Sequence, residues 1–253
     1  DSSEEMVNVK ERVEDNIGED SIDEVQKITC ATVKMAAVSM KTNKGDVSGS
    51  FSSDAIRNAP DILFENLAAV FRSWLYHGTV TKSFLACAFM PLLKNSLKDP
   101  GETKSYRAIA GSSLWLKLFD RVILLIWGHL LSSGSLQMGY KKKSSTAQCS
   151  YVMMETVSYY LNNGSNPIMV ALDMSSAFDK CSFDVMFSKL ERRLPAIVIR
   201  VLIFSYQHQK AWVKWGNTSK SSVFSISNGT KQGSVLSPAL FSVYVQDLLD
   251  ELK

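Results

Sequence analysis

Two short segments of the chain hold residue types suited to metal or phosphoryl-transfer chemistry. The first runs from Val170 to Asp179, and in it Asp173 directly follows an apolar run. A carboxylate at the C-terminal end of a buried strand points out of the sheet into a crevice, where α/β folds place metal and phosphate chemistry. In the plain alternative, Asp173 ends its strand and caps the following turn. The residues alone leave both interpretations open.

The second segment, Asn228–Pro238, is a polar loop that leads directly into a predicted helix. Its glycines let the backbone approach a substrate closely, while Gln232 offers an amide and Lys231 a charge. The alternative is an ordinary turn before a helix that starts with Ser or Pro.

The hydrophobic pattern predicts the elements that would position these segments. The apolar run 168–172 is typical of a buried central strand that ends at Asp173. We therefore predict an α/β (α+β) fold, helix-rich, with a small and mostly antiparallel sheet. The expected helices cover residues 21–40, 61–76, 113–131, 146–162, 183–193, 195–210 and 238–252, and the other strands cover 85–93, 106–110, 211–215 and 223–227.

The composition is that of an ordinary globular protein, with 253 residues of which 45% are hydrophobic and 21% charged. These proportions exclude collagen-like, low-complexity and disulfide-scaffold classes. The four cysteines stand without a CxxC pair, which argues against zinc and fits a reducing compartment. Charged residues interrupt the most apolar run, 118–131, and the acidic N-terminus has no apolar segment after it. We therefore expect neither a membrane segment nor a secretory signal.

The net charge of +3 is unevenly distributed, since residues 1–24 carry −8 and residues 25–253 carry +11. We expect the acidic lead-in to be mobile or loosely helical. The basic remainder is compatible with a polyanionic partner such as nucleic acid, although many basic surfaces bind nothing. Trp212 and Trp215 should lie on opposite faces of a strand, either as core packing or as a stacking platform for bases.

The two segments together resemble consecutive motifs of the reverse transcriptases of non-LTR (LINE-type) retrotransposons. Asp-x-x-x-Ala-Phe-Asp at 173–179 resembles the first palm motif, and Gly-x-x-Gln-Gly-Ser-x-Leu-Ser-Pro at 229–238 resembles the next one. Upstream, the segments 91–94, 106–109 and 137–141 resemble fingers segments, in the family's order. The resemblance covers roughly residues 25–253.

The resemblance implies a right-hand polymerase fold of fingers and partial palm. On this interpretation residues 1–24 are the acidic lead-in, 25–165 are fingers-like, and 166–253 form a partial palm with the first two palm motifs. The hydrophobic pattern and the resemblance thus both predict a helix-rich α/β architecture.

The resemblance also assigns roles to the matching residues. Asp173 would be catalytic and would bind two magnesium ions, with the backbone of Met174 completing its ligands. Phe178 would be the steric gate that excludes a ribose 2′-hydroxyl, although a core aromatic is the alternative. Lys94 and Arg107 would clamp the incoming triphosphate.

Two further groups of residues are implied to bind substrates. Gln232 and Gly233 would line the nucleotide pocket from the opposite wall. Lys141, Lys142 and Lys143 would face the template backbone, although a solvated loop is the simpler interpretation of this run.

The third palm motif, an aromatic-x-Asp-Asp hairpin, has no counterpart, because the sequence contains no Asp-Asp pair. Two metals need more than one carboxylate, so we expect this chain alone to be inactive. The resemblance implies RNA-directed DNA polymerase activity, with two magnesium ions, in the complete enzyme. It implies an RNA template, a DNA primer and deoxynucleoside triphosphates as partners, and action in the nucleus and cytoplasm. A non-catalytic nucleic-acid-binding remnant is the alternative, and the oligomeric state stays open.

Overall fold

The computed structural model describes residues 2–95, 97–141, 143–216, 219–230 and 233–251. Its helices are α1 (Ser2–Asp15), α2 (Ser21–Gln26), α3 (Cys30–Val38), α4 (Ser53–Arg57), α5 (Asp61–His77), α6 (Leu114–Trp127), α7 (Thr146–Asn162), α8 (Phe183–Leu190), α9 (Ala196–Gln207), α10 (Ser237–Tyr244) and α11 (Gln246–Glu251). Its strands are β1 (Ala86–Leu93), β2 (Tyr106–Ser112), β3 (Lys210–Trp215), β4 (Ser219–Lys220) and β5 (Phe224–Ser225).

Local capping sets several of the helix boundaries. Thr29 and Thr32 form a capping box that starts α3, so the single helix expected over 21–40 is divided into α2 and α3. Ser145 starts α7 in the same way, with Gln148 as its partner. Gly78 ends α5 in the left-handed conformation, which glycine adopts without steric cost.

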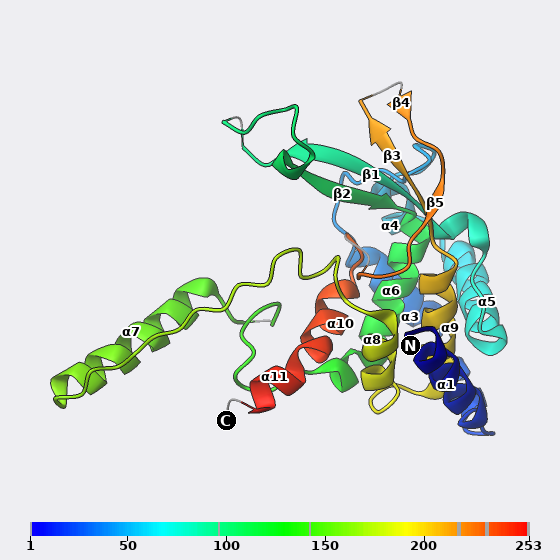
Figure 1. The fold of residues 1–253 in the computed structure, drawn as a ribbon. Coiled ribbons are helices and arrows are strands. Elements are labelled where there is room, and N and C mark those ends of the chain that lie inside the picture. Colours follow the sequence, from blue (N-terminus) through cyan, green and yellow to red (C-terminus); the bar gives the residue numbers. More distant parts are fainter. Residues whose placement is uncertain (1, 96, 142, 217–218, 231–232, 252–253) are drawn as a thin grey trace.

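The five strands form one small mixed sheet in the order β2-β1-β3-β4, and β5 also pairs with β3 (Figure 1). The β1–β2, β3–β4 and β3–β5 pairs are antiparallel, and β1–β3 is parallel. The helix-rich α/β class with a mostly antiparallel sheet is therefore confirmed. The loop between β1 and β2 and the hairpin from β3 to β4 extend from the same end of the sheet.

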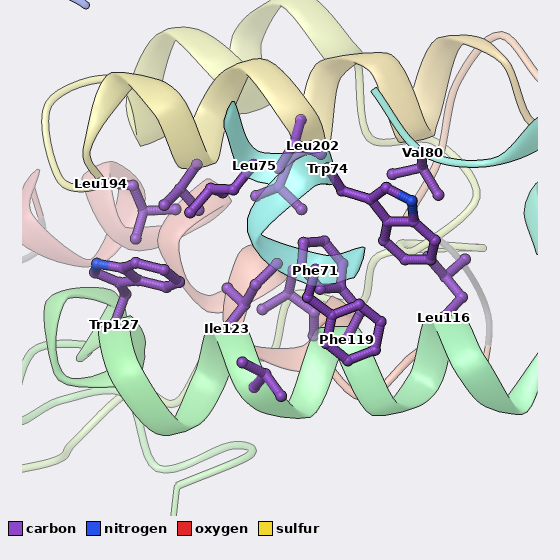
Figure 2. Packing of buried hydrophobic residues seen from close by; sticks show 14 of the residues in the cluster. Phe71, Trp74, Leu75, Val80, Leu116, Phe119, Ile123, Trp127, Leu194 and Leu202 are labelled. Carbon is purple, nitrogen blue, oxygen red and sulfur yellow. The ribbon is translucent and has the colours of Figure 1, made fainter. Parts of the chain in front are cut away.

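The main core lies between α5, α6 and α9 (Figure 2). The Phe119 ring packs 5.1 Å from Phe71 and 5.3 Å from Trp74, measured between centroids. At the far end of α6, the Trp127 indole N–H donates to a Glu24 carboxylate oxygen over 2.6 Å. Each of these large side chains contributes about 1.5–3 kcal/mol through removal from water. This core fixes α6, which directly follows β2 in the chain.

The acidic N-terminal segment is a packed helix, contrary to the expectation of a mobile or loosely helical lead-in. Met6, Val9 and Val13 of α1 are buried, and α1 contacts α8 and α9. These three residues recur at helical spacing, so they form one apolar stripe among the acids. The acidic composition concealed that stripe in the sequence.

The expectation of a buried strand over 168–172 is wrong. The segment belongs to no strand, and Ile168, Val170 and Leu172 are 91%, 76% and 79% exposed. An isolated strand is not stable, because its backbone groups need a neighbouring strand to bond. None of the described strands lies beside this segment, which follows α7 where that helix projects from the body (Figure 1).

Within the described ranges, no helix has the length and apolar character needed to cross a membrane.

Candidate nucleotide-binding site

The two motif segments meet through backbone hydrogen bonds. The Thr230 N–H donates to the Phe178 carbonyl oxygen, and the Gly229 N–H donates to the Cys181 carbonyl oxygen, both over 2.7 Å. Gly229 has φ of +87°, and a Cβ there would lie 2.9 Å from the Asp179 carbonyl oxygen. The close approach of the two segments thus depends on a glycine at position 229.

Gly233 brings the second motif onto the sheet. Its φ is +85°, and a Cβ there would lie 2.7 Å from the carbonyl oxygen of Ala110 in β2. A cavity of about 50 Å³ lies where β2 meets the two motif segments, lined by residues that include Ala110, Asp179 and Gly229. Three segments that are remote in the sequence therefore converge: the end of β2, the loop 175–181, and the loop that contains Gly233.

The Phe178 ring is half-buried between two other rings. It stacks on Phe241 of α10 with centroids 4.7 Å apart, and Tyr140 meets it edge-on at 5.6 Å. These contacts fix the ring orientation, which both a steric gate and a core aromatic require. Sequence reasoning did not identify Phe241 as a partner, and the only sequence signal was its aromatic type.

A partly buried hydrogen bond holds the second motif against α6. The Ser234 hydroxyl donates to a carboxylate oxygen of Asp120 over 2.6 Å and accepts the Leu236 N–H over 3.1 Å. Burial lowers the pKa of Lys117, one turn earlier on α6, although the charges of Asp46 and Asp120 act in the opposite direction. Sequence reasoning missed this contact, although a carboxylate within an apolar helix was the available signal.

The expected triphosphate clamp consists of Lys94 and Arg107, and the Lys94 side chain is bonded elsewhere. The Lys94 ammonium donates to the carbonyl oxygen of Lys104, over 2.8 Å, and so turns toward its own loop. Arg107 is exposed on β2 and lies opposite Leu92 of β1. The two basic residues thus share one end of the β1–β2 ladder, with the Lys94 ammonium engaged by the backbone of its own loop.

The expected metal and template residues that the structure describes are exposed. Asp173 and Met174 directly follow 168–172 and belong to no helix or strand. The Lys141 ammonium donates to the Gly134 carbonyl oxygen over 3.3 Å, and Lys143 is exposed with φ of +64°. Lys142 and Gln232 lie outside the described residues.

Metal-ligating side chains do not gather in the described part of the chain. Among those residues, no group of three or more His, Cys, Asp or Glu side chains is arranged to hold a metal ion. Asp173 alone does not make a two-metal site, so the described residues do not fit a pair of magnesium ions.

A family model described as reverse transcriptase (RNA-dependent DNA polymerase) matches residues 93–253. The chain is 24% identical, over 87% of its length, to the RNA-directed DNA polymerase from mobile element jockey of Drosophila melanogaster. It is 27% identical, over 70% of its length, to a probable RNA-directed DNA polymerase from transposon BS of the same species. A jockey polymerase of Drosophila funebris is 25% identical over 87% of the chain. The matches cover 24%, 21% and 24% of these relatives, so the chain spans about a quarter of their length or less.

Proposed function

Because the chain belongs to the reverse transcriptase family, we propose that it is part of an RNA-directed DNA polymerase of a non-LTR retrotransposon. Its substrates are an RNA template, a DNA primer and deoxynucleoside triphosphates. The family membership expected from the motifs at 173–179 and 229–238 is confirmed. The nucleus and cytoplasm, which the family implies, are the proposed sites of action.

The observation that carries the proposal is the meeting of the two motif segments. Gly229 and Thr230 bond to the segment that holds Phe178, and Gly233 lies on the backbone of Ala110. A nucleotide pocket needs these segments on adjacent walls, with backbone close enough to contact the substrate. The two segments lie about fifty residues apart in the sequence, and their contact supports a common role in nucleotide binding.

The proposed roles follow the positions of the residues. Gly233 lines the nucleotide pocket beside β2, and the Phe178 ring, fixed by Phe241, limits the space under the sugar. Gln232, which lies outside the described residues, is proposed on the resemblance alone to bind the nucleotide. Arg107 contributes charge to the triphosphate from the exposed side of β2.

The other proposed residues lie on exposed segments. Lys94 supports the same triphosphate after its side chain leaves the Lys104 carbonyl. The run Lys141–Lys143 contacts the template backbone through its charge.

The family generally uses divalent metal ions. Asp173, with the backbone of Met174, is the contribution that this chain makes to metal binding. The paired magnesium site does not fit the described residues, so we expect the 253-residue chain to lack polymerase activity by itself.

Primer extension tests the proposal, with a poly-rA template, an oligo-dT primer, dTTP and magnesium. This chain is compared with a longer version that supplies an aromatic-x-Asp-Asp segment after Lys253. We expect extension by the longer protein only, and loss of extension on Asp173→Asn.

The matched control is Asp23→Asn, at an exposed aspartate of α2. It makes the same chemical change far from the motifs, so activity should be retained. A longer protein that is folded but inactive, or one in which Asp173→Asn keeps full activity, contradicts the proposal.

A further inference from the structure

A carboxylate lies within the buried surface of α6, against the second motif. Asp120 is 5% exposed, and a carboxylate is costly to bury unless a donor or a cation is paired with it. The Ser234 hydroxyl donates to it, and Lys117 and Arg121 of the same helix interact with its charge. Because α6 belongs to the main core, the carboxylate is a fixed anchor for Ser234.

Ser234 connects this anchor to the backbone on both of its sides. Its oxygen accepts the Leu236 N–H over 3.1 Å, immediately before α10 begins at Ser237. On the other side, Gly233 has φ of +85° and lies so close to the Ala110 carbonyl oxygen that a Cβ would be 2.7 Å from it. One serine side chain therefore joins α6 to the backbone between β2 and the first turn of α10.

The helix that starts at this point carries the ring that supports Phe178. Phe241 of α10 stacks on Phe178 with centroids 4.7 Å apart. The bond from Ser234 to the Asp120 carboxylate thus lies between two parts of the proposed nucleotide pocket: Gly233 beside β2, and the aromatic pair.

We infer that Asp120 is a positioning residue for the incoming nucleotide and that it acts through Ser234. The carboxylate keeps the backbone at 233–236 in the conformation that lines the pocket, so the pocket is ordered before the nucleotide arrives. Without this bond only a fraction of the molecules has that conformation, and the apparent affinity for the nucleotide falls by the same fraction. The inference rests on the proposed function, because it takes Gly233 as part of a nucleotide pocket.

Positioning and general stability predict different kinetic changes. A residue that only stabilises the fold changes how much of the enzyme is folded, so its loss lowers kcat per total protein and leaves KM unchanged. A residue that positions the pocket changes KM for the nucleotide and leaves kcat nearly unchanged, because the nucleotide-bound state is the same. The ratio of the two effects therefore separates the two roles.

The kinetic test is primer extension by the longer protein that supplies an aromatic-x-Asp-Asp segment, with dTTP varied at saturating template and primer. Asp120→Leu and Ser234→Ala should each raise KM for dTTP about 2–10-fold and change kcat less than about twofold. Asp120→Asn retains an acceptor oxygen for the serine hydroxyl, so it should restore a KM close to that of the parent.

The matched control is Ser242→Ala, which removes another hydroxyl from α10. The Ser242 hydroxyl donates to the Pro238 carbonyl oxygen of its own helix over 2.9 Å, so its loss should leave KM unchanged. A lower kcat with an unchanged KM in Asp120→Leu would overturn the inference, since the carboxylate would then act on the fold alone. An equal rise of KM in Ser242→Ala and Ser234→Ala would also overturn it.

Hydrogen exchange of the 253-residue chain, followed by NMR, tests the same bond without any polymerase activity. The Leu236 amide should exchange about 2–10-fold faster in Asp120→Leu than in the parent, and at the parent rate in Ser242→Ala. Unchanged exchange in Asp120→Leu would overturn the inference whether or not the longer protein is active. Faster exchange together with an inactive longer protein would support the anchoring of Ser234 and contradict the proposed function.

Discussion

Replacing Gly229 by alanine should destabilise the chain by about 2–5 kcal/mol, for two reasons that add. The first is conformational, because a left-handed backbone costs a residue with a Cβ about 1–2 kcal/mol. The second is spatial, because the new Cβ would lie 2.9 Å from the Asp179 carbonyl oxygen and 3.0 Å from that of Phe178. Backbone cannot yield as a flexible side chain does, so the two motif segments must separate.

The spatial part can be worked out from the hydrogen bonds between the two segments. Separation weakens the bonds donated by Gly229 and Thr230, which contribute about 0.5–1.5 kcal/mol each. Gly49→Ala isolates the conformational part, because Gly49 has φ of +75° and nothing lies within 4 Å of its added Cβ. This control should cost about 1–2 kcal/mol.

Urea unfolding followed by circular dichroism measures both free energies of unfolding. The gain from restricting the unfolded chain is common to both Gly→Ala changes and cancels in their difference. We expect Gly229→Ala to cost about 1–3 kcal/mol more than Gly49→Ala. Equal losses would refute the reasoning, because they would mean that the motif segments do not meet at Gly229.

Four more experiments test other parts of the structure. Asp120→Leu and Ser234→Ala should each lower the free energy of unfolding in urea by about 1–3 kcal/mol, and the double variant should lose less than the sum of the two. Strictly additive losses would argue against the hydrogen bond between the two residues. Burial raises the pKa of the Cys181 thiol from 9.0 to about 11, so at pH 8 Cys149 should react first with a thiol reagent, and comparable rates would contradict this burial. Because the pKa of Cys181 is higher in the folded chain, the folded chain binds this proton more tightly than the unfolded chain does. The resulting contribution to the free energy of unfolding is fully present below pH 9 and is lost as the pH rises to about 11. Urea unfolding at a series of pH values across that range would detect the loss. Trp127→Ala should cost about 3–5 kcal/mol, and a melting temperature unchanged from that of the parent chain would contradict its place in the core.

The sequence was most informative where structure is set by nearby residues. Helix α5 follows from its apolar spacing, and the expected bounds of 61–76 for α5 and 146–162 for α7 differ little from those observed. The β1–β2 ladder was also predicted, because two apolar runs flank a turn-rich connection. The glycine-rich loop was recognised as a place of close approach, and Gly229 and Gly233 both make one.

Sequence reasoning failed where distant residues decide the outcome. The apolar run 168–172 reads as a buried strand, but burial depends on a neighbouring strand that no local pattern reveals. The contact of Asp120 with Ser234 joins residues 114 positions apart, and composition gives no information about such a pair. The acids of α1 suggested a mobile or loosely helical segment, whereas its apolar stripe packs firmly against α8 and α9.

The packing of α1 also determines when the chain can complete its fold during synthesis. The Arg12 guanidinium bonds to the Glu191 carboxylate over 3.0 Å, across 179 positions, and Arg200 bonds to Glu14. Because α1 precedes α8 and α9 in the chain, it is synthesised before them, and Val9 and Val13 stay in solvent until those two helices have left the ribosome. Loops of that length close slowly, because closure costs entropy before any packing compensates for it. The order of synthesis thus makes this helix an early candidate for chaperone binding.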